Sequence, residues 1–192
     1  MAKEFYASSD VVFGKDAVHK LSEILKAYKA KSVMVVYGSS VKRVGIAQKV
    51  LNEVEKAQVK ITVFEGVIPN PTNEVVEEAA EIARRENVDV FVAVGGGSPI
   101  DTAKAMCMLQ THEGSVRDYL FGGTKQVERP IMPLICVPTT AGTGSEMTAA
   151  SVITNNQEKT KVSVTHENLI PKMALIDPSL HVGMPPFITA TT

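Results

Sequence analysis

The chain has 192 residues, of which 44% are hydrophobic, and a formal net charge of −1 from 20 basic and 21 acidic residues. This size is sufficient for one substantial core, and the interspersed charges leave no basic face for nucleic acid or an anionic membrane. The N-terminal residues form no apolar signal segment, and no apolar run approaches the roughly 20 residues that a bilayer-spanning helix needs. Cys107 and Cys136 both lie in apolar surroundings, so we expect free thiols in a cytoplasmic protein.

The first part of the chain alternates between β-structure and helix. Residues 5–13 mix aromatic and β-branched side chains, which predicts a short hairpin or two edge strands. Residues 16–30 have apolar side chains at helical spacing. An apolar run over residues 32–37 predicts a buried strand, and a helix is expected over about residues 44–57.

The same alternation continues through the next segments. Residues 60–64 are typical of a strand, residues 73–86 of an amphipathic helix, and residues 88–94 of a strand buried on both faces. Repeated βα units predict a mostly parallel, Rossmann-like sheet with helices on both faces. Right-handed crossovers then bring the loops after the strands, including the proline-restricted loop over residues 65–72, to one edge.

The strand over residues 88–94 leads into Gly95-Gly-Gly-Ser-Pro99, after which apolar residues recur at helical spacing. Glycines let a ligand approach the main chain, and Pro99 is tolerated in the first turn of a helix. The free N–H groups and positive dipole end of such a helix suit a phosphate. A tight connection without a ligand is the alternative interpretation of the turn on its own.

A second loop of small residues and hydroxyls follows later in the chain. Residues 114–129 are predicted to be a surface excursion and residues 130–137 a strand. The loop over residues 138–145 can provide short hydrogen bonds to a ribose or a phosphate. Alternatively, it only connects elements, with Thr143 or Ser145 as the N-cap of a helix.

The remaining residues predict two further β-structures. Residues 150–154 and 161–165 flank a polar turn and predict a hairpin. Residues 173–180 predict the last strand.

Three motifs together resemble the iron-containing (group III) alcohol dehydrogenase family. They are Pro69-Asn-Pro-Thr72, Gly95-Gly-Gly-Ser-Pro-Ile-Asp-Thr-Ala-Lys104 and Pro138-Thr-Thr-Ala-Gly-Thr-Gly-Ser-Glu-Met-Thr148, in the family's order. The resemblance implies that residues 1–192 form the N-terminal dinucleotide-binding domain of such an enzyme, without the family's C-terminal helical metal-binding domain.

The resemblance also implies a set of cofactor-binding residues. Among them Asn70 faces the phosphates, Lys161 reaches the ribose, and Asp101 lies near the nicotinamide end together with Thr102. The full set is Gly38, Ser39, Ser40, Asn70, Gly96, Gly97, Ser98, Asp101, Thr139, Thr140, Thr143, Thr148, Lys161 and Leu180.

The choice between NADP and NAD depends on the tip of the strand over residues 32–37. Many NAD-preferring members place an aspartate there, whose carboxylate binds ribose hydroxyls and repels a 2′-phosphate. This chain has Gly38, with Lys42 and Arg43 close behind, and resembles the members that accept NADP. The sequence therefore favours NADP over NAD, although a solvated helix start explains the two cations equally simply.

The family's metal ligands are not found in this sequence. In the family an aspartate and three histidines hold Fe(II), or Zn, just beyond the equivalent of Thr191 and Thr192. Asp177 and His181 are four residues apart, but Pro178 argues against a regular helix through them and no third ligand is near in the sequence. We expect no bound metal, and hence weak nucleotide binding with little or no turnover by this chain alone.

The family chemistry is hydride transfer between a primary alcohol, or its aldehyde, and the nicotinamide. The family's N-terminal strand pairs across a dimer, so a homo-oligomer is expected.

Two other functions stay open from the sequence. One is a related enzyme, such as a glycerol or polyol-phosphate dehydrogenase or a dehydroquinate synthase-like lyase. The other is a nucleotide-binding or interaction module without catalysis.

Overall fold

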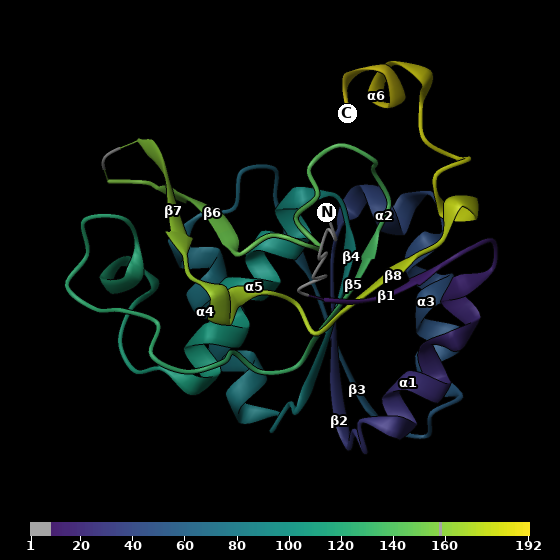
Figure 1. The fold of residues 1–192 in the computed structure, drawn as a ribbon, viewed down its shortest axis with the longest axis horizontal. Helices are drawn as coiled ribbons and strands as arrows, with labels where there is room; N and C mark the ends of the chain where they lie inside the picture. Colours follow the sequence, from purple (N-terminus) through teal and green to yellow (C-terminus); the bar gives the residue numbers. More distant parts are fainter. Residues whose placement is uncertain (1–8, 158) are drawn as a thin grey trace, which may run out of the picture.

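The computed structural model describes residues 9–157 and 159–192, in which a parallel sheet lies between two layers of helices (Figure 1). The strands of this sheet are β1 (Asp10–Phe13), β2 (Ser32–Gly38), β3 (Lys60–Val67), β4 (Val90–Gly95), β5 (Leu134–Pro138) and β8 (Met173–Ile176). A separate antiparallel hairpin consists of β6 (Ala150–Asn155) and β7 (Thr160–Thr165). The predicted α/β class, the Rossmann-like sheet and the later hairpin are confirmed.

The strand order places two glycine-bearing strand ends side by side in the middle of the sheet. The order is β1-β8-β5-β4-β2-β3, and every neighbouring pair is parallel. The chain runs from β2 to β3 on one side and then returns to the other side of β2 to form β4. Such a reversal opens a crevice at the carboxyl ends of the two strands, which here are Gly38 and Gly95.

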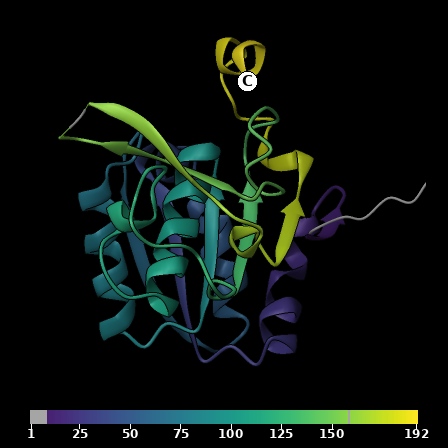
Figure 2. The same ribbon diagram turned by 60° about the vertical axis from the view of Figure 1, so that its left-hand side comes forward.

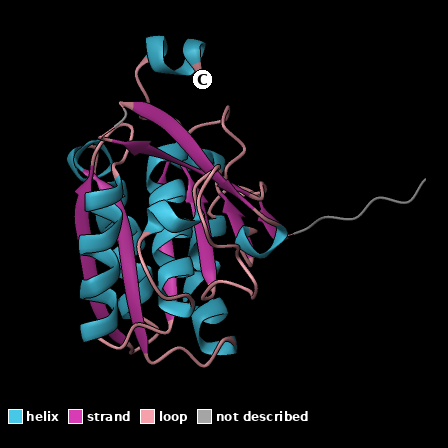
Figure 3. Ribbon diagram, turned by 90° about the vertical axis from the view of Figure 1, so that its left-hand side faces the viewer, coloured by secondary structure: helices cyan, strands magenta, loops and turns pink. Residues whose placement is uncertain are grey.

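Helices cover both faces of the sheet. The α-helices are α1 (Leu21–Ala27), α2 (Ser39–Arg43), α3 (Ile46–Glu55), α4 (Asn73–Arg85), α5 (Gly97–Thr111) and α6 (Pro186–Thr191). The 3-10 helices are η1 (Ala17–Lys20), η2 (Val116–Tyr119), η3 (Glu167–Leu169) and η4 (Pro178–Leu180). Helices α1 and α3 pack on one face, and α4 and α5 on the other (Figures 1 and 3). Helix α6 lies beyond the carboxyl edge of the sheet (Figure 2), and no helix of the described residues is long and apolar enough to cross a bilayer.

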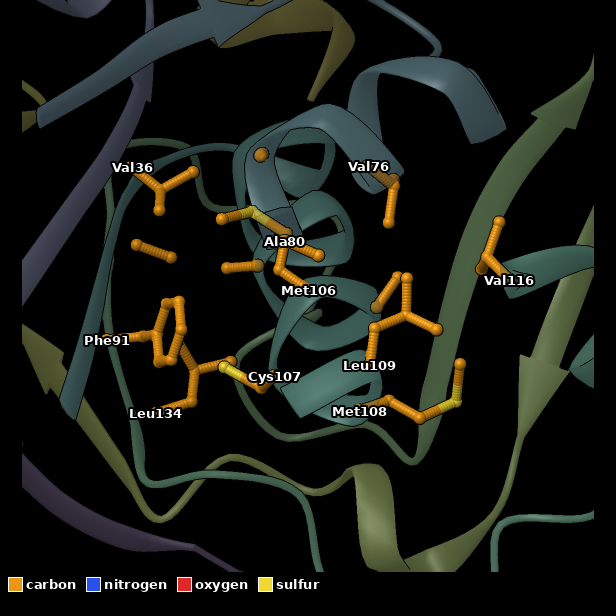
Figure 4. Packing of buried hydrophobic residues seen from close by; sticks show 14 of the residues in the cluster. Val36, Val76, Ala80, Phe91, Met106, Cys107, Met108, Leu109, Val116 and Leu134 are labelled. Carbon is orange, nitrogen blue, oxygen red and sulfur yellow. The ribbon is translucent and has the colours of Figure 1, made fainter. Parts of the chain in front are cut away.

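Helix α5 is enclosed on all sides, unlike the amphipathic helix of a protein surface. Its residues from Pro99 to Leu109 are all buried. The sheet contributes Phe91 and Leu134 to its surroundings (Figure 4), and the hairpin contributes Ile153. This packing fixes the direction of α5, whose first turn follows directly from β4 at the crevice.

Two helices differ from the sequence prediction at their starts. The helix predicted over residues 44–57 is α3, which begins only at Ile46 because Gly45 before it adopts the left-handed conformation with a φ of 78°. The short helix α2, on the other side of Gly45, was not predicted. Helix α5 begins at Gly97 rather than Pro99. Proline fits here because the first turn of a helix needs no N–H from it.

The two late strands of the sheet are shorter than predicted, because proline interrupts both segments. The strand predicted over residues 130–137 begins only after Pro133. The strand predicted over residues 173–180 ends at Ile176, and Pro178 starts η4. Proline has no N–H to donate to a ladder of hydrogen bonds.

The segment over residues 114–129 is more than a surface excursion. It contains η2, and it buries Val116, Tyr119, Leu120 and Val127 in the same apolar cluster as α4 and α5.

At the N-terminus, β1 is an edge strand that pairs in parallel with β8. Residues 5–8 of the predicted hairpin or edge strands lie outside the described residues.

Candidate functional site

The two loops singled out in the sequence lie side by side at the carboxyl edge of the sheet. Gly95, at the end of β4, is paired with Pro138, at the end of β5, and the N–H of Thr139 donates to the carbonyl of Gly95 at 3.0 Å. The φ of Gly95 is 140°, and a Cβ there would lie 2.7 Å from Cγ of Pro99. A side chain at this position would therefore obstruct the turn that joins β4 to α5.

The next two glycines allow the second loop to approach the main chain of the turn. A Cβ on Gly96 would lie 2.9 Å from Oγ1 of Thr140, and a Cβ on Gly97 would lie 3.1 Å from Cγ2 of Thr143. Both distances are shorter than ordinary van der Waals contact, so the absence of side chains is what lets these loops meet. The structure thus brings Gly96, Gly97, Ser98, Thr139, Thr140 and Thr143 together.

Two sets of polar groups at this junction have no partner among the residues that the structure describes. The N-cap of α5 is Gly96, and no side chain caps the helix, so the first-turn N–H groups of Gly97 and Ser98 have no capping acceptor. The hydroxyl oxygen of Thr140 is buried without a partner among the described residues. A helix of 15 residues directs its positive dipole end to the same place. A phosphate with several acceptor oxygens fits this set of groups.

The tip of β2 lies across the crevice and is less open than its sequence suggests. A Cβ on Gly38 would lie 2.9 Å from the backbone oxygen of Val67, where the register of β2 and β3 shifts. Ser39 begins α2 directly and is exposed, as is Ser40. The ammonium of Lys42 forms an ion pair of 2.7 Å with Glu65 on β3.

Asn70 and Lys161 come together through the β6–β7 hairpin. The hydroxyl of Thr154 donates to the carbonyl of Asn70 at 3.2 Å, and the N–H of Thr154 donates to the carbonyl of Pro71 at 2.7 Å. Lys161 is the cross-strand partner of Thr154. Asn70 has a φ of 55°, a left-handed conformation that asparagine tolerates better than most residues. Both Asn70 and Lys161 are exposed.

Three of the implied cofactor residues are engaged within the protein. Leu180 is 2% exposed and packs in the apolar cluster of α1 and α3. Thr148 accepts a hydrogen bond from the ammonium of Lys104 through its hydroxyl at 3.1 Å. Asp101 is only 9% exposed, and its backbone carbonyl accepts from the hydroxyl of Ser151 at 2.7 Å.

Lys104 is a functional candidate that the sequence did not reveal. It ends the first motif, and in the structure it is completely buried, with its ammonium donating to the carbonyls of Thr148 at 2.6 Å and Ala150 at 2.8 Å. Burial lowers the pKa of Lys104, and the nearby Asp101 carboxylate opposes that shift. Only the three-residue spacing from Asp101 to Lys104, which puts both on one side of a helix, could have suggested this pair.

Asp101 gives a prediction about pH. Burial raises its pKa from 3.8 to about 6, against the opposing effects of Lys104, the N–H of Val152 and the hydroxyl of Ser145. The folded chain therefore holds this proton more tightly than the unfolded chain. The resulting stabilisation is complete below about pH 4 and is lost as pH rises through about 6, a change of roughly 3 kcal/mol.

The variant Asp101→Asn cannot titrate at this position. We expect the difference in free energy of unfolding between the natural chain and this variant to change by that amount between about pH 4 and pH 7, in urea titrations. The natural chain should lose stability relative to the variant as the pH rises. An equal difference at both pH values would contradict the assignment.

Comparison with known proteins identifies the family of this chain. Residues 8–178 match the family described as iron-containing alcohol dehydrogenase. The chain belongs to this family. It is 39% identical over 180 residues to choline dehydrogenase of Bacillus subtilis (strain 168), a match that covers 93% of this chain and 45% of that protein.

Solved structures of a dehydrogenase and a reductase share the fold. NADH-dependent butanol dehydrogenase A from Thermotoga maritima matches with a TM-score of 0.90 and 34% identity, over 98% of this chain and 47% of that one. Sulfoacetaldehyde reductase from Bifidobacterium kashiwanohense, solved in complex with NAD+, matches with a TM-score of 0.89 and 32% identity. This match covers 100% of this chain and 50% of that one. The chain thus spans about half the length of the relatives it matches.

The family's name implies iron, and the described residues do not fit it. No group of three or more histidine, cysteine, aspartate or glutamate side chains in residues 9–157 and 159–192 could hold a metal ion. Cys107 and Cys136 are both buried as free thiols, and burial raises the pKa of each. We therefore assign no metal-dependent step to these residues.

Proposed function

We propose that this chain binds a nicotinamide dinucleotide across the crevice between β2 and β4, as the cofactor-binding half of an NAD(P)-dependent alcohol dehydrogenase. The observation that carries the proposal is the uncapped first turn of α5, with the buried, unpartnered hydroxyl of Thr140 close to its N-cap, Gly96. A pyrophosphate satisfies the N–H groups and the hydroxyl together.

Each part of the dinucleotide has its own contacts in this proposal. The pyrophosphate lies on the N–H groups of Gly97 and Ser98, with Thr139, Thr140 and Thr143 as further donors. Asn70 lies toward the phosphates and Lys161 toward the ribose, and both adjoin Thr154 of the hairpin. The nicotinamide end lies toward Asp101 and Thr148. Leu180 would contact the cofactor only at the edge of its apolar cluster.

The reaction we propose is oxidation of a primary alcohol to its aldehyde, or the reverse. The bound dinucleotide supplies the hydride acceptor at C4 of the nicotinamide, while the alcohol loses its hydroxyl proton. The residues described here bind and orient the dinucleotide, and polarisation of the alcohol oxygen is assigned to none of them. Residues 1–192 alone should therefore bind dinucleotide and oxidise a panel of alcohols slowly or not at all.

We further propose that the site prefers NADP(H) to NAD(H). None of Gly38, Ser39 and Ser40 has an acidic side chain, so none of these three residues repels a 2′-phosphate. The ion pair with Glu65 neutralises Lys42 and leaves Arg43 as the cation available to attract that phosphate.

The substitution Ser39→Asp tests this preference. It adds a carboxylate at an exposed position, in the first turn of α2, where an acid is favourable. Gly38→Asp is the less useful variant, because its Cβ would collide with the backbone of Val67. In calorimetric titrations we expect Ser39→Asp to shift the ratio of the Kd values for NADPH and NADH by about tenfold or more, in favour of NADH. Ser39→Asn is the matched uncharged control, and an equal effect of both variants would contradict the electrostatic explanation.

We propose that the protein is located in the cytoplasm, in keeping with its two free buried thiols.

We also propose that it assembles as a homo-oligomer. Strand β1 is an edge of the sheet and exposes Phe13 by 72% and Val11 by 45%. An exposed apolar edge strand favours pairing with another chain.

A further inference from the structure

Lys104 uses its whole hydrogen-bonding capacity on one short segment of the chain. An ammonium has three donors, and the structure provides three acceptors: the carbonyl of Thr148, its hydroxyl, and the carbonyl of Ala150. The side chain is completely buried in the middle of α5. Burying an ammonium is unfavourable unless its donors are paired, so these bonds determine where the segment lies.

The segment that Lys104 holds is the far end of the second loop. Residues 139–149 contain no helix or strand. Within their last part, the N–H of Met147 donates to the carbonyl of Gly144 at 2.9 Å and that of Thr148 to the carbonyl of Ser145 at 3.4 Å. The near end is tied to the glycine turn through the N–H of Thr139. At the far end the N–H of His166 donates to the carbonyl of Ala149 at 3.0 Å, which ties the loop to the β6–β7 hairpin. Lys104 adds the attachment of this end to α5.

Asp101 reinforces the same connection one turn earlier on α5. Its backbone carbonyl accepts from the hydroxyl of Ser151 at 2.7 Å, and its carboxylate lies near enough to the hydroxyl of Ser145 and the N–H of Val152 for both to lower its pKa. Helix α5, whose N-terminus would hold the phosphate, and the loop, whose hydroxyls would meet the same phosphate, are therefore joined through buried polar bonds.

We propose that Lys104 is a positioning residue of the dinucleotide site. It holds the loop over residues 139–149 against α5, so that Thr140 and Thr143 stand over Gly96 and Gly97. The proposal rests on the function proposed above for this site. Lys104 itself, being completely buried, touches no ligand.

A matched control separates this role from a general contribution to stability. Gln110 lies on the same helix, and its amide donates to the carbonyl of Ala80 on α4 at 2.9 Å. The variant Gln110→Met removes a side-chain bond to a backbone carbonyl without affecting the loop. Lys104→Met removes the three bonds to the loop, and Lys104→Gln retains donors for the carbonyls and serves if the methionine variant does not fold.

The experiment combines amide hydrogen exchange without ligand and calorimetric titration with NADPH, on the natural chain and each variant. We expect the Lys104 variants to accelerate exchange at Met147 and Thr148 at least tenfold relative to amides of β4, and to raise the Kd for NADPH at least tenfold. The effect of Lys104→Gln should be the smaller of the two. Gln110→Met should change neither the ratio of exchange rates nor the Kd for NADPH, even if it lowers the melting temperature.

Two results would overturn the proposal. One is a ratio of amide exchange rates, at Met147 and Thr148 relative to β4, that is the same in the Lys104 variants as in the natural chain. The other is a loss of NADPH affinity in the Lys104 variants that is no larger than the loss in Gln110→Met, when the two substitutions destabilise the chain equally. If the natural chain binds neither NADPH nor NADH, the proposed function fails, and the exchange measurement still decides separately whether Lys104 orders the loop.

Discussion

Replacing Gly96 with alanine should weaken dinucleotide binding at least about tenfold while leaving the fold in place. The new Cβ would lie 2.9 Å from the buried hydroxyl of Thr140, so the second loop must move away from the turn. Overpacking of this kind costs about 1–3 kcal/mol, and a factor of ten in affinity corresponds to about 1.4 kcal/mol. Gly96 has a φ of −84°, so alanine strains no backbone angle, and the loss of affinity reports crowding by the new Cβ.

The affinity of the Gly96→Ala variant for NADPH is measured by calorimetry. The control is Gly183→Ala, because nothing lies within 4 Å of a Cβ at Gly183. A complementary variant, Thr140→Val, removes the unpartnered hydroxyl. It should leave the stability of the free chain unchanged or higher, since that hydroxyl has no partner to lose, and should still weaken NADPH binding. Full affinity in both site variants would contradict the proposed phosphate position.

Asp177→Ala should give the largest loss of stability, about 3–5 kcal/mol. Its carboxylate is completely buried and accepts from the N–H groups of Asp16 at 3.1 Å, Val18 at 3.2 Å and Ser179 at 2.9 Å. These bonds join the start of η1 to the end of β8, two segments far apart in the sequence. Without the carboxylate, buried N–H groups are left unpaired at that end of the sheet.

The charge of Asp177 makes its contribution depend on pH. Burial alone would raise its pKa, but hydrogen bonds from Ser179, Val18 and Asp16 outweigh burial and hold the pKa below its usual value. The stabilisation is therefore present above the ordinary pKa of an aspartate, about 3.9, and is lost as pH falls through the lower, folded value. Urea unfolding at about pH 7 and about pH 3 should show the loss caused by Asp177→Ala shrinking at the acidic end.

Asp89 provides the control for this prediction. It also accepts from backbone N–H groups, those of Lys31 at 2.9 Å and Ser32 at 3.1 Å, but it is only partly buried. Because water can replace its bonds, Asp89→Ala should cost no more than about 1 to 1.5 kcal/mol. A loss for Asp177→Ala as small as that for Asp89→Ala would contradict the importance of burial.

Local patterns were sufficient to predict the elements that surround the site. The apolar run into Gly95 predicted a strand, and the glycine turn predicted the start of a helix, because both depend on neighbouring residues only. The position of both loops at one edge of the sheet followed from right-handed crossovers between parallel strands. The family resemblance and the fold were both confirmed.

The bonds between distant segments could not be predicted. Lys104 meets Thr148 across 44 residues, and Asp177 meets Val18 across 159. Neither separation has a pattern of its own in one sequence, since a buried lysine and a solvated one look alike until the fold places them. The crowding of Gly38 by Val67 was hidden for the same reason, because it arises where β2 meets β3.

The most direct test of the central claim is to follow backbone amide chemical shifts while NADPH is added to the chain. The claim predicts that the largest changes occur at Gly96, Gly97 and Ser98, with Thr140 next, and that they saturate together. The far end of α5 provides the contrasting location, because two open pockets there share His112, Glu113 and Arg129. Changes centred on those residues, or no saturable changes at all, would contradict the assignment of the dinucleotide to the glycine turn.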